Sequence, residues 1–597
     1  MHLRPPRLLT LLPLLALAAL APTAPAAQRA APEGLPVSGL PAEDPVTAWV
    51  WSLPDEEVRV MDHLEELVDG IGPRLTSSSN LEEAEQWALQ RFRDWGLDAR
   101  LVEWGTFPVG FDRTWKRGRM VAPRKVELDF TTPAWTPGTD GPVRGRAVVL
   151  PANDEELAAV HSLLPGAWVL VPGKRPRFDS DGDDFSSRLG RALDEAGIAG
   201  TLRPSRNEEL VHTGGSYRID PDDLPHRVRI VLRRDQFSDV LQRVRDGQEV
   251  ELEFDVRQEF RPGPIALHDV IAEIPGTDLA DEIVIVGGHL DSWDGARGAQ
   301  DNGTGTATTM EAARLLAAAM AETGLRPRRT IRFMLWSGEE QGLLGSRAYI
   351  EAHPEENDRV NLVLVHDGGT NACSGITATP MMLPLFEEVF APIVARTADL
   401  EDEDLRFRIV PVDQLPFGVG SDHDSYLAVG VPGFFWKQRG DASYGYIHHT
   451  QHDLLDQVVP EYERYTSRVV ASAAWRFANA GPRVPREDMG VRGERPPRRR
   501  LGVHLGDGLR VDEVVRGGLA EAAGIVPGDR IVEVDGRSVS SVGELVRALR
   551  ADGDRKRVVW EHGGERRAAW FDWGKGEATP TTAPTKPSPA PPAPGGR

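Results

Sequence analysis

Acidic and imidazole side chains follow three of the apolar segments that this sequence predicts as β-strands. The segments are EIVIVGG (282–288), RTIRFMLW (329–336) and VNLVLVHD (360–367). At or just beyond their carboxyl ends come His289, Asp291, Glu339, Glu340 and Asp367. Ligands of an open α/β sheet bind beyond the carboxyl ends of its strands. We therefore expect these side chains to meet at one edge of a sheet.

Two more candidates lie in polar turns, Asp301 in GAQDNGTG and His449 in IHHTQHD. A zinc ion takes about four ligands from His, carboxylate and thiolate groups. Five candidate ligands are too many for one catalytic ion that keeps a water, but they suit two Zn²⁺ ions that share a carboxylate. These ligands are His289, Asp301, Glu340, Asp367 and His449. Glu339 remains beside a ligand, where it can act as general base and then as general acid.

Strands and helices that would position these residues alternate from residue 261 to about 480. Helices are predicted over 306–323 and 384–396, and a further strand over 431–436. Continuous apolar strands between helices predict an α/β fold, with a mixed, mostly parallel sheet sandwiched by helices. An amino-terminal helical region belongs with it, so that 45–120 and 261–480 form one domain.

The rest of the chain predicts further units. Residues 121–260 alternate short β-like runs with turns rich in Gly, Pro and Asp, which indicates a β-rich insert. A basic linker (485–500) leads to a small β-rich unit (501–573), and 574–597 has the composition of a disordered tail.

Six ordered blocks within 287–453 resemble the two-zinc aminopeptidase family. The blocks are GGHLDSWD, GAQDNGTG, SGEEQGLLGS, LVHDGGT, GSDHDSYLAVGVPG and HHTQHD. GHLDSWD and the doubled histidine are most similar to the carboxypeptidase Q branch. Taken singly, each candidate ligand is more often a helix cap or a satisfied polar group, so the prediction rests on their joint order.

The resemblance implies a role for each ligand. Asp301 would bridge both zinc ions. One ion would be completed by His289 and Asp367, and the other by Glu340 and His449. His448 is an alternative to His449, which is preferred because it keeps the His-x-x-x-Asp spacing to the aspartate at 453.

The resemblance also implies roles around the metals. Glu339 would be the catalytic base, and Asp291 would orient the His289 ring. Asp422 and His423 would shape the substrate end of the site. An equally good alternative is that these two residues only cap a loop. The sequence departs from the family at Gln300, where Asp or Asn is usual before the bridging aspartate.

The insert and the carboxyl-terminal unit resemble known modules. Residues 121–260 are similar, more weakly, to the protease-associated domain of such enzymes. LAEAAGIVPGDRIVEVDGRSV (519–539) resembles a PDZ domain. Its peptide-binding loop would be Leu501, Gly502 and Val503, which would receive the C-terminus of a partner protein. The alternative is a closed packing module without a ligand.

Composition and the amino terminus limit the remaining possibilities. The 597-residue chain has a net charge of −22, which argues against nucleic-acid binding. Residues 1–26 join a basic start, a short apolar run and a small-residue cleavage site, which predicts a signal peptide and a secreted or periplasmic protein. The apolar run is shorter than the roughly 18 residues of a stable membrane span.

These observations predict an exported zinc exopeptidase that hydrolyses short peptides. It would act as an aminopeptidase or as a dipeptidase similar to the carboxypeptidase Q branch. The alternative is an inactive peptidase-fold binding protein or a PDZ scaffold. A homodimer is compatible with the sequence.

Overall fold

The computed structural model describes most of the chain. The described residues are 38–173, 182–490, 501–505, 509–514, 518–539, 545, 548–549, 555–573 and 577–580. The predicted signal peptide (1–26) lies outside them, as does most of the predicted linker. Among the described residues, no helix has both the length and the apolar character to cross a membrane.

A mixed sheet forms the centre of the largest unit, with strand order β1-β10-β12-β11-β13-β16. The strands are β1 (Asp98–Phe107), β10 (Ile265–Ile274), β11 (Leu279–His289), β12 (Arg329–Trp336), β13 (Val360–Val365) and β16 (Gly433–Phe435). The β11–β12, β11–β13 and β13–β16 pairs are parallel. The pairs of β10 with β1 and with β12 are antiparallel. The predicted mixed, mostly parallel sheet is confirmed.

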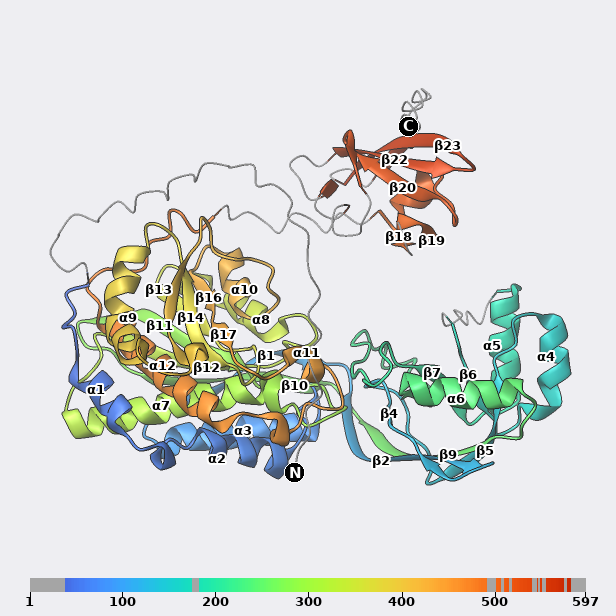
Figure 1. The fold of residues 1–597 in the computed structure, drawn as a ribbon, viewed down its shortest axis with the longest axis horizontal. Coiled ribbons are helices and arrows are strands. Elements are labelled where there is room, and N and C mark those ends of the chain that lie inside the picture. The colour runs from blue at the N-terminus through green and yellow to red at the C-terminus, as the bar shows by residue number, and fades with distance from the viewer. Residues whose placement is uncertain are drawn as a thin grey trace, which may run out of the picture.

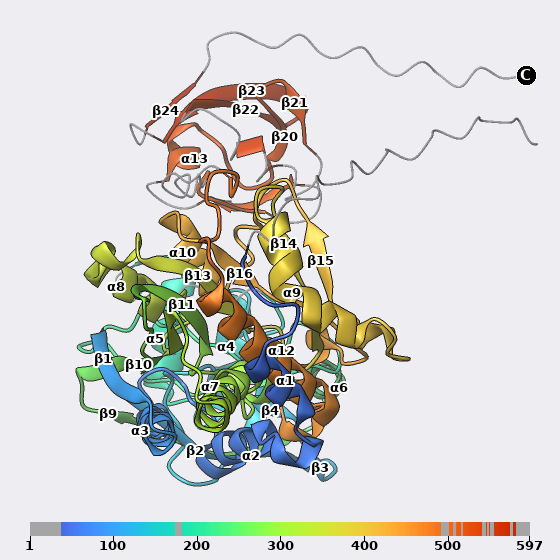
Figure 2. The same ribbon diagram turned by 90° about the vertical axis from the view of Figure 1, so that its left-hand side faces the viewer.

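Helices cover both faces of this sheet (Figures 1 and 2). The covering helices are α3 (Ser79–Asp94), α7 (Thr304–Thr323), α8 (Leu344–Ala352), α9 (Leu383–Thr397), α10 (His423–Ala428) and α12 (Pro460–Asn479). Side chains of β11 alternate between the faces, as the period of two in a strand requires. Val284 packs into the core under α7 and α12, whereas Ile285 packs into a second core with Tyr349 and Tyr426.

The strand register brings the predicted site residues to one edge. His289 pairs with Trp336 of β12, and Gly287 pairs with Val365 of β13. The segments that follow these strands therefore leave the sheet at the same end. Gly305 lets α7 approach this edge, because a Cβ there would lie 2.2 Å from the carbonyl oxygen of His366.

The insert has a sheet of its own, with order β3-β2-β9-β5-β6-β7-β8-β4. Its strands are β2 (Gly110–Ala122), β3 (Val126–Glu127), β4 (Phe130–Thr131), β5 (Val143–Val149), β6 (Trp168–Leu170), β7 (Gly200–Pro204), β8 (Arg229–Leu232) and β9 (Glu251–Arg261). Its helices are α4 (Asp154–Val160), α5 (Phe185–Glu195) and α6 (Arg234–Arg245). The long pair β2 and β9 connects the insert to the central unit (Figure 1).

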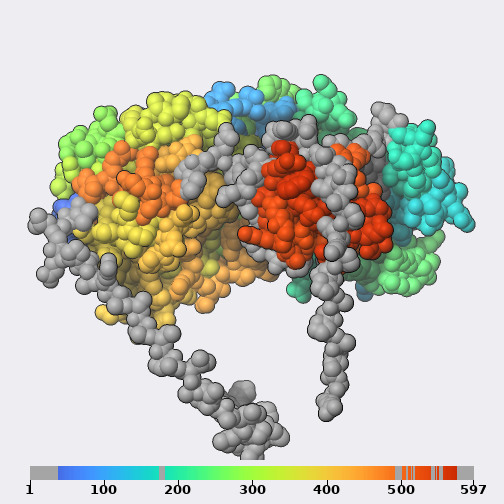
Figure 3. Space-filling model, turned by 90° about the horizontal axis from the view of Figure 1, so that it is seen from above, coloured from blue at the N-terminus to red at the C-terminus, as the bar shows by residue number. Residues whose placement is uncertain are grey.

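The carboxyl-terminal unit is small and β-rich, as predicted, and appears in red in Figure 3. It contains β18 (Val503–Leu505), β19 (Val511–Val514), α13 (Leu519–Ala522), β20 (Arg530–Val534), β21 (Arg537–Ser538), β22 (Arg555–His562), β23 (Glu565–Asp572) and β24 (Glu577–Pro580). The structure differs from the predicted disordered tail at β24, which pairs with β23. An edge strand such as β23 offers unpaired backbone groups to a following segment.

Candidate metal centre

Asp301 lies between two groups of candidate ligands. One of its carboxylate oxygens, Oδ1, lies 3.4 Å from Nε2 of His289, and the other, Oδ2, lies 3.2 Å from Nε2 of His449. Nε2 of His289 also lies 3.1 Å from Oδ1 of Asp367. Nε2 of His449 lies 2.9 Å from Oε2 of Glu340. The structure thus brings the five predicted ligands together, with Asp301 common to both groups.

Backbone contacts fix the positions of these ligands. Nδ1 of His289 donates to the carbonyl oxygen of Asp291 at 2.9 Å, which turns Nε2 toward the carboxylates. The Asp453 carboxylate accepts the backbone N–H groups of Gln300 at 2.6 Å and Asp301 at 3.3 Å. The turn that carries the shared aspartate is therefore anchored to the loop that carries the histidines.

Asp291 contacts three parts of the centre. Its carboxylate lies 3.5 Å from Nδ1 of His289, whereas its carbonyl oxygen lies 2.9 Å from the same nitrogen. The same carboxylate accepts the backbone N–H groups of Glu339 at 3.1 Å and Glu340 at 3.4 Å, and the Thr76 hydroxyl at 3.1 Å. Asp291 therefore positions the two glutamates as well as the imidazole.

The centre carries a large excess of negative charge. Burial and the charge of Asp301 raise the pKa of Glu340 to about 7. Burial, together with the charge of Asp367, raises the pKa of Glu339 well above its usual value. Burial opposes protonation of His449, yet the carboxylates of Glu340 and Asp301 raise its pKa to about 11. Such a cluster is stabilised by added positive charge.

The donor set fits metal cations. Among the described residues, Oδ2 of Asp301 and Oε1 of Glu340 are buried and accept no hydrogen bond. A buried carboxylate oxygen without a donor is costly unless a cation faces it. Asp301 belongs to two groups of residues, and within each group the potential ligand atoms all lie within 4.8 Å of one another. One group adds His289 and Asp367, and the other adds His448 and His449. Imidazole and carboxylate groups are ligands that suit zinc.

The two adjacent histidines differ in their contacts. Nε2 of His448 lies 3.8 Å from Asp301, and its ring stacks between the rings of Tyr444 and His449. His449 approaches both Asp301 and Glu340. The geometry therefore favours His449 as the ligand and leaves His448 beside it.

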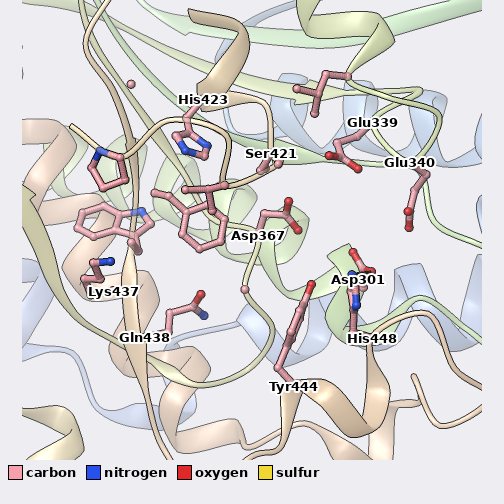
Figure 4. Close-up of a pocket in the computed structure, with 18 of the residues that line it drawn as sticks. Asp301, Glu339, Glu340, Asp367, Ser421, His423, Lys437, Gln438, Tyr444 and His448 are labelled. Carbon is pink, nitrogen blue, oxygen red and sulfur yellow. Dashed lines mark ion pairs between the residues drawn. The ribbon is translucent and has the colours of Figure 1, made fainter. Parts of the chain in front are cut away.

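A cavity of about 770 Å³ opens onto the carboxylates (Figure 4). His423 lines this cavity, but Asp422 does not. The Asp422 side chain is fully buried, and its charge helps to raise the pKa of Glu339. Tyr444 also lines the cavity, with its hydroxyl end directed toward Asp301 and Asp367. Sequence reasoning missed Tyr444, and its only signal was its place shortly before the doubled histidine.

The loop predicted to bind peptides lies at the start of the carboxyl-terminal unit. Leu501 is buried in the core of that unit, and its carbonyl oxygen accepts the backbone N–H of Ala520 at 2.8 Å. Gly502 has a φ of +83°, and Val503 begins β18.

Comparison with known proteins identifies a peptidase domain and a PDZ domain in this chain. Residues 269–474 match the model of peptidase family M28, and residues 510–561 match the PDZ domain model. Carboxypeptidase Q of Rattus norvegicus is 27% identical over 441 residues, covering 72% of this chain and 87% of that protein. The Homo sapiens protein of the same name is 26% identical over 436 residues, with the same coverage.

A solved structure shares the fold. The peptidase M28 precursor from Shewanella amazonensis SB2B aligns with a TM-score of 0.51 and 24% sequence identity. The alignment covers 74% of this chain and 96% of that chain.

Proposed function

Because this chain is a family M28 peptidase, a metallo-exopeptidase homologous to carboxypeptidase Q that also carries a PDZ domain, we propose that it hydrolyses short peptides at a centre of two zinc ions. The observation that carries this proposal is the position of Asp301. Its two carboxylate oxygens face different histidines, His289 and His449. A carboxylate in that position can bridge two ions.

The side chains divide between the two ions. His289 and Asp367 would hold one ion, and Glu340 and His449 would hold the other, with Asp301 common to both. When bound, zinc would polarise the peptide carbonyl and make water more acidic. Asp291 keeps the His289 ring and the two glutamates in position.

Glu339 is the proposed proton carrier. Its carboxylate lines the cavity beside Glu340 and Asp367, two of the proposed ligands. It takes a proton from the attacking water as the water oxygen bonds to the peptide carbonyl carbon. It then gives that proton to the amide nitrogen as the C–N bond breaks.

The proposed substrates are short peptides, cleaved by an aminopeptidase or a dipeptidase activity. The test is turnover of free dipeptides, N-blocked dipeptides and aminoacyl amides, with chelator and with zinc restored. Cleavage of aminoacyl amides would mark an aminopeptidase, and cleavage confined to unblocked dipeptides would mark a dipeptidase. A zinc-loaded protein that cleaves none of these substrates would contradict the proposal.

The other units have proposed roles of their own. We propose that residues 1–26 direct export and are removed, which amino-terminal sequencing of the mature protein from its source cell would test. We propose that the insert is a protease-associated domain. The PDZ domain is proposed to bind the C-terminus of a partner protein through Leu501, Gly502 and Val503. Loss of binding to a C-terminal peptide library in Leu501→Asp, with the unit still folded by circular dichroism, would support this role.

A further inference from the structure

A second cavity, of about 1190 Å³, also opens onto the metal centre. It shares Glu340, His448 and His449 with the first cavity, so both reach the same cluster. Its opposite wall comes from the insert, from strands β7 and β8, the start of α6 and the loop 205–216. A peptide whose scissile bond lies at the metals can therefore extend into this cavity as well as into the first.

The insert wall of this cavity is strongly basic. Arg203 and Arg206 line it, and neither guanidinium group forms an ion pair with a carboxylate in the described part of the chain. Arg229 and Arg234 line it as well. Among the described lining residues the only carboxylate is that of Glu340. This concentration of positive charge stands out in a chain with a net charge of −22.

The charges of this wall act on one another and on the metal loop. Burial and the nearby charge of Arg206 lower the pKa of Arg203. Burial lowers the pKa of His212 as well, and the charges of Arg206 and His449 add to that effect. Arg206 and the predicted zinc ligand His449 therefore act on the same side chain, that of His212.

Backbone hydrogen bonds tie this wall to the metal centre. Thr213 donates its N–H to the carbonyl oxygen of His449 at 2.9 Å, and Gln451 donates its N–H to Val211 at 3.1 Å. The Gln451 side chain accepts the N–H of Val211 at 2.7 Å. The loop after Arg206 is therefore held at a fixed place relative to the metal ligands.

We propose that this cavity is a substrate subsite in which Arg203 and Arg206 bind a carboxylate on the leaving-group side of the scissile bond. The inference rests on the proposed peptidase function. Guanidinium groups bind carboxylates through charge-assisted and often bidentate hydrogen bonds. A cationic cavity in an acidic protein also concentrates anionic substrates locally. The carboxylate is either the free C-terminus of a dipeptide or the side chain of an acidic residue.

The test compares the double variant Arg203→Gln/Arg206→Gln with wild type and with Arg245→Gln. Arg245 is an exposed arginine at the far end of α6, about 16 Å along the helix from Arg234. The substrates are alanyl-leucine, alanyl-leucine amide and alanyl-glutamic acid amide. In the double variant we expect KM to rise about tenfold or more for a substrate with a carboxylate, with kcat nearly unchanged. Alanyl-leucine amide should be unaffected, and Arg245→Gln should match wild type.

The two peptides with a carboxylate distinguish its source. A KM effect on alanyl-leucine alone identifies the chain terminus, and an effect on alanyl-glutamic acid amide alone identifies the acidic side chain. Equal changes for all three substrates, or no change for any, would overturn the proposal.

A binding measurement separates this proposal from the proposed function. Calorimetry with N-acetyl-leucine and its amide requires no turnover. We expect wild type to bind the acid about tenfold more tightly than the amide, and the double variant to lose that preference. If wild type cleaves no peptide but keeps this preference, the peptidase proposal fails and the anion subsite stands. Equal Kd values for acid and amide in wild type would overturn the subsite.

Discussion

The backbone N–H of Thr213 donates to the carbonyl oxygen of His449 at 2.9 Å, so a residue of the insert holds a predicted zinc ligand in place. His449 has a φ of +54°, in the left-handed region that a histidine rarely adopts. A bridge between His212 and Thr450 extends the contact. Conformations of this kind persist where the surroundings fix them, and they are common at functional sites.

Glu339→Gln should lower kcat by about a hundredfold to ten-thousandfold, the usual contribution of a general base. Glutamine cannot take up the proton of the attacking water, although it fills the same space. Zinc content should stay at the wild-type level, because Glu339 is not a proposed ligand. Steady-state kinetics with metal analysis of the same sample tests this, and full turnover in the variant would rule out the assigned role.

His449→Ala should lose zinc, whereas His448→Ala should keep it. The reason is that His449 approaches both Asp301 and Glu340, while His448 lies 3.8 Å from Asp301 and stacks on Tyr444. Elemental analysis of the two purified variants makes the comparison, and each serves as the control for the other. Greater zinc loss in His448→Ala would show that the ligand had been assigned to the wrong histidine.

Glu463→Gln should raise stability at alkaline pH. Burial raises the pKa of Glu463 from 4.5 to about 8, against the hydrogen bonds from Thr370 and Thr308 that lower it. The unfolded chain releases this proton near pH 4.5, but the folded protein keeps it until about pH 8. Wild-type stability is therefore lost between these values as pH rises.

The glutamine variant carries no such proton, so its advantage in Tm should grow from pH 5 to pH 8 and then level off. Thermal unfolding of both proteins across this range tests the prediction. Thr308→Val is a useful companion, because it removes one hydrogen bond to Glu463 and should not reproduce the pH dependence. A Tm difference that does not change with pH would show that Glu463 ionises in the folded protein as it does in the unfolded chain.

Asp291→Ala should lower both zinc affinity and kcat, by about tenfold to a hundredfold, as expected for a group that orients ligands. Its carboxylate accepts the backbone N–H groups of both Glu339 and Glu340. Asp291→Asn keeps one acceptor oxygen and should be less impaired. The measurements are zinc dissociation constants by competition with a chelator and kcat at saturating zinc. Wild-type values for both in Asp291→Ala would contradict this role.

Part of the candidate centre could be predicted from the sequence, because three of its residues lie at or just beyond the ends of apolar strands. A buried parallel strand reads as a continuous apolar run, so the positions of His289, Glu340 and Asp367 could be assigned before any contact was known. Asp291 was expected to orient the His289 ring, and its carbonyl oxygen makes a closer contact with that ring than its carboxylate does. A sequence gives no means of choosing between these two oxygens.

Features that depend on contacts between distant segments were not predictable. Arg203 and Arg206 occur among many arginines of the insert, and nothing local shows that they line a cavity shared with His449. Tyr444 was missed for a similar reason, because the fold of the following turn decides where its hydroxyl points. Periodicity reports which face of an element is buried but not which remote loop packs against it.

The zinc content of purified wild type and Asp301→Ala tests the central claim most directly. Asp278→Ala is the matched control, since Asp278 is an exposed carboxylate paired with Arg328. With Asp301 bridging both groups of ligands, wild type and the control should bind two zinc ions per chain, and Asp301→Ala should bind fewer than one. A single ion in wild type, or two ions retained in Asp301→Ala, would contradict a shared two-zinc centre.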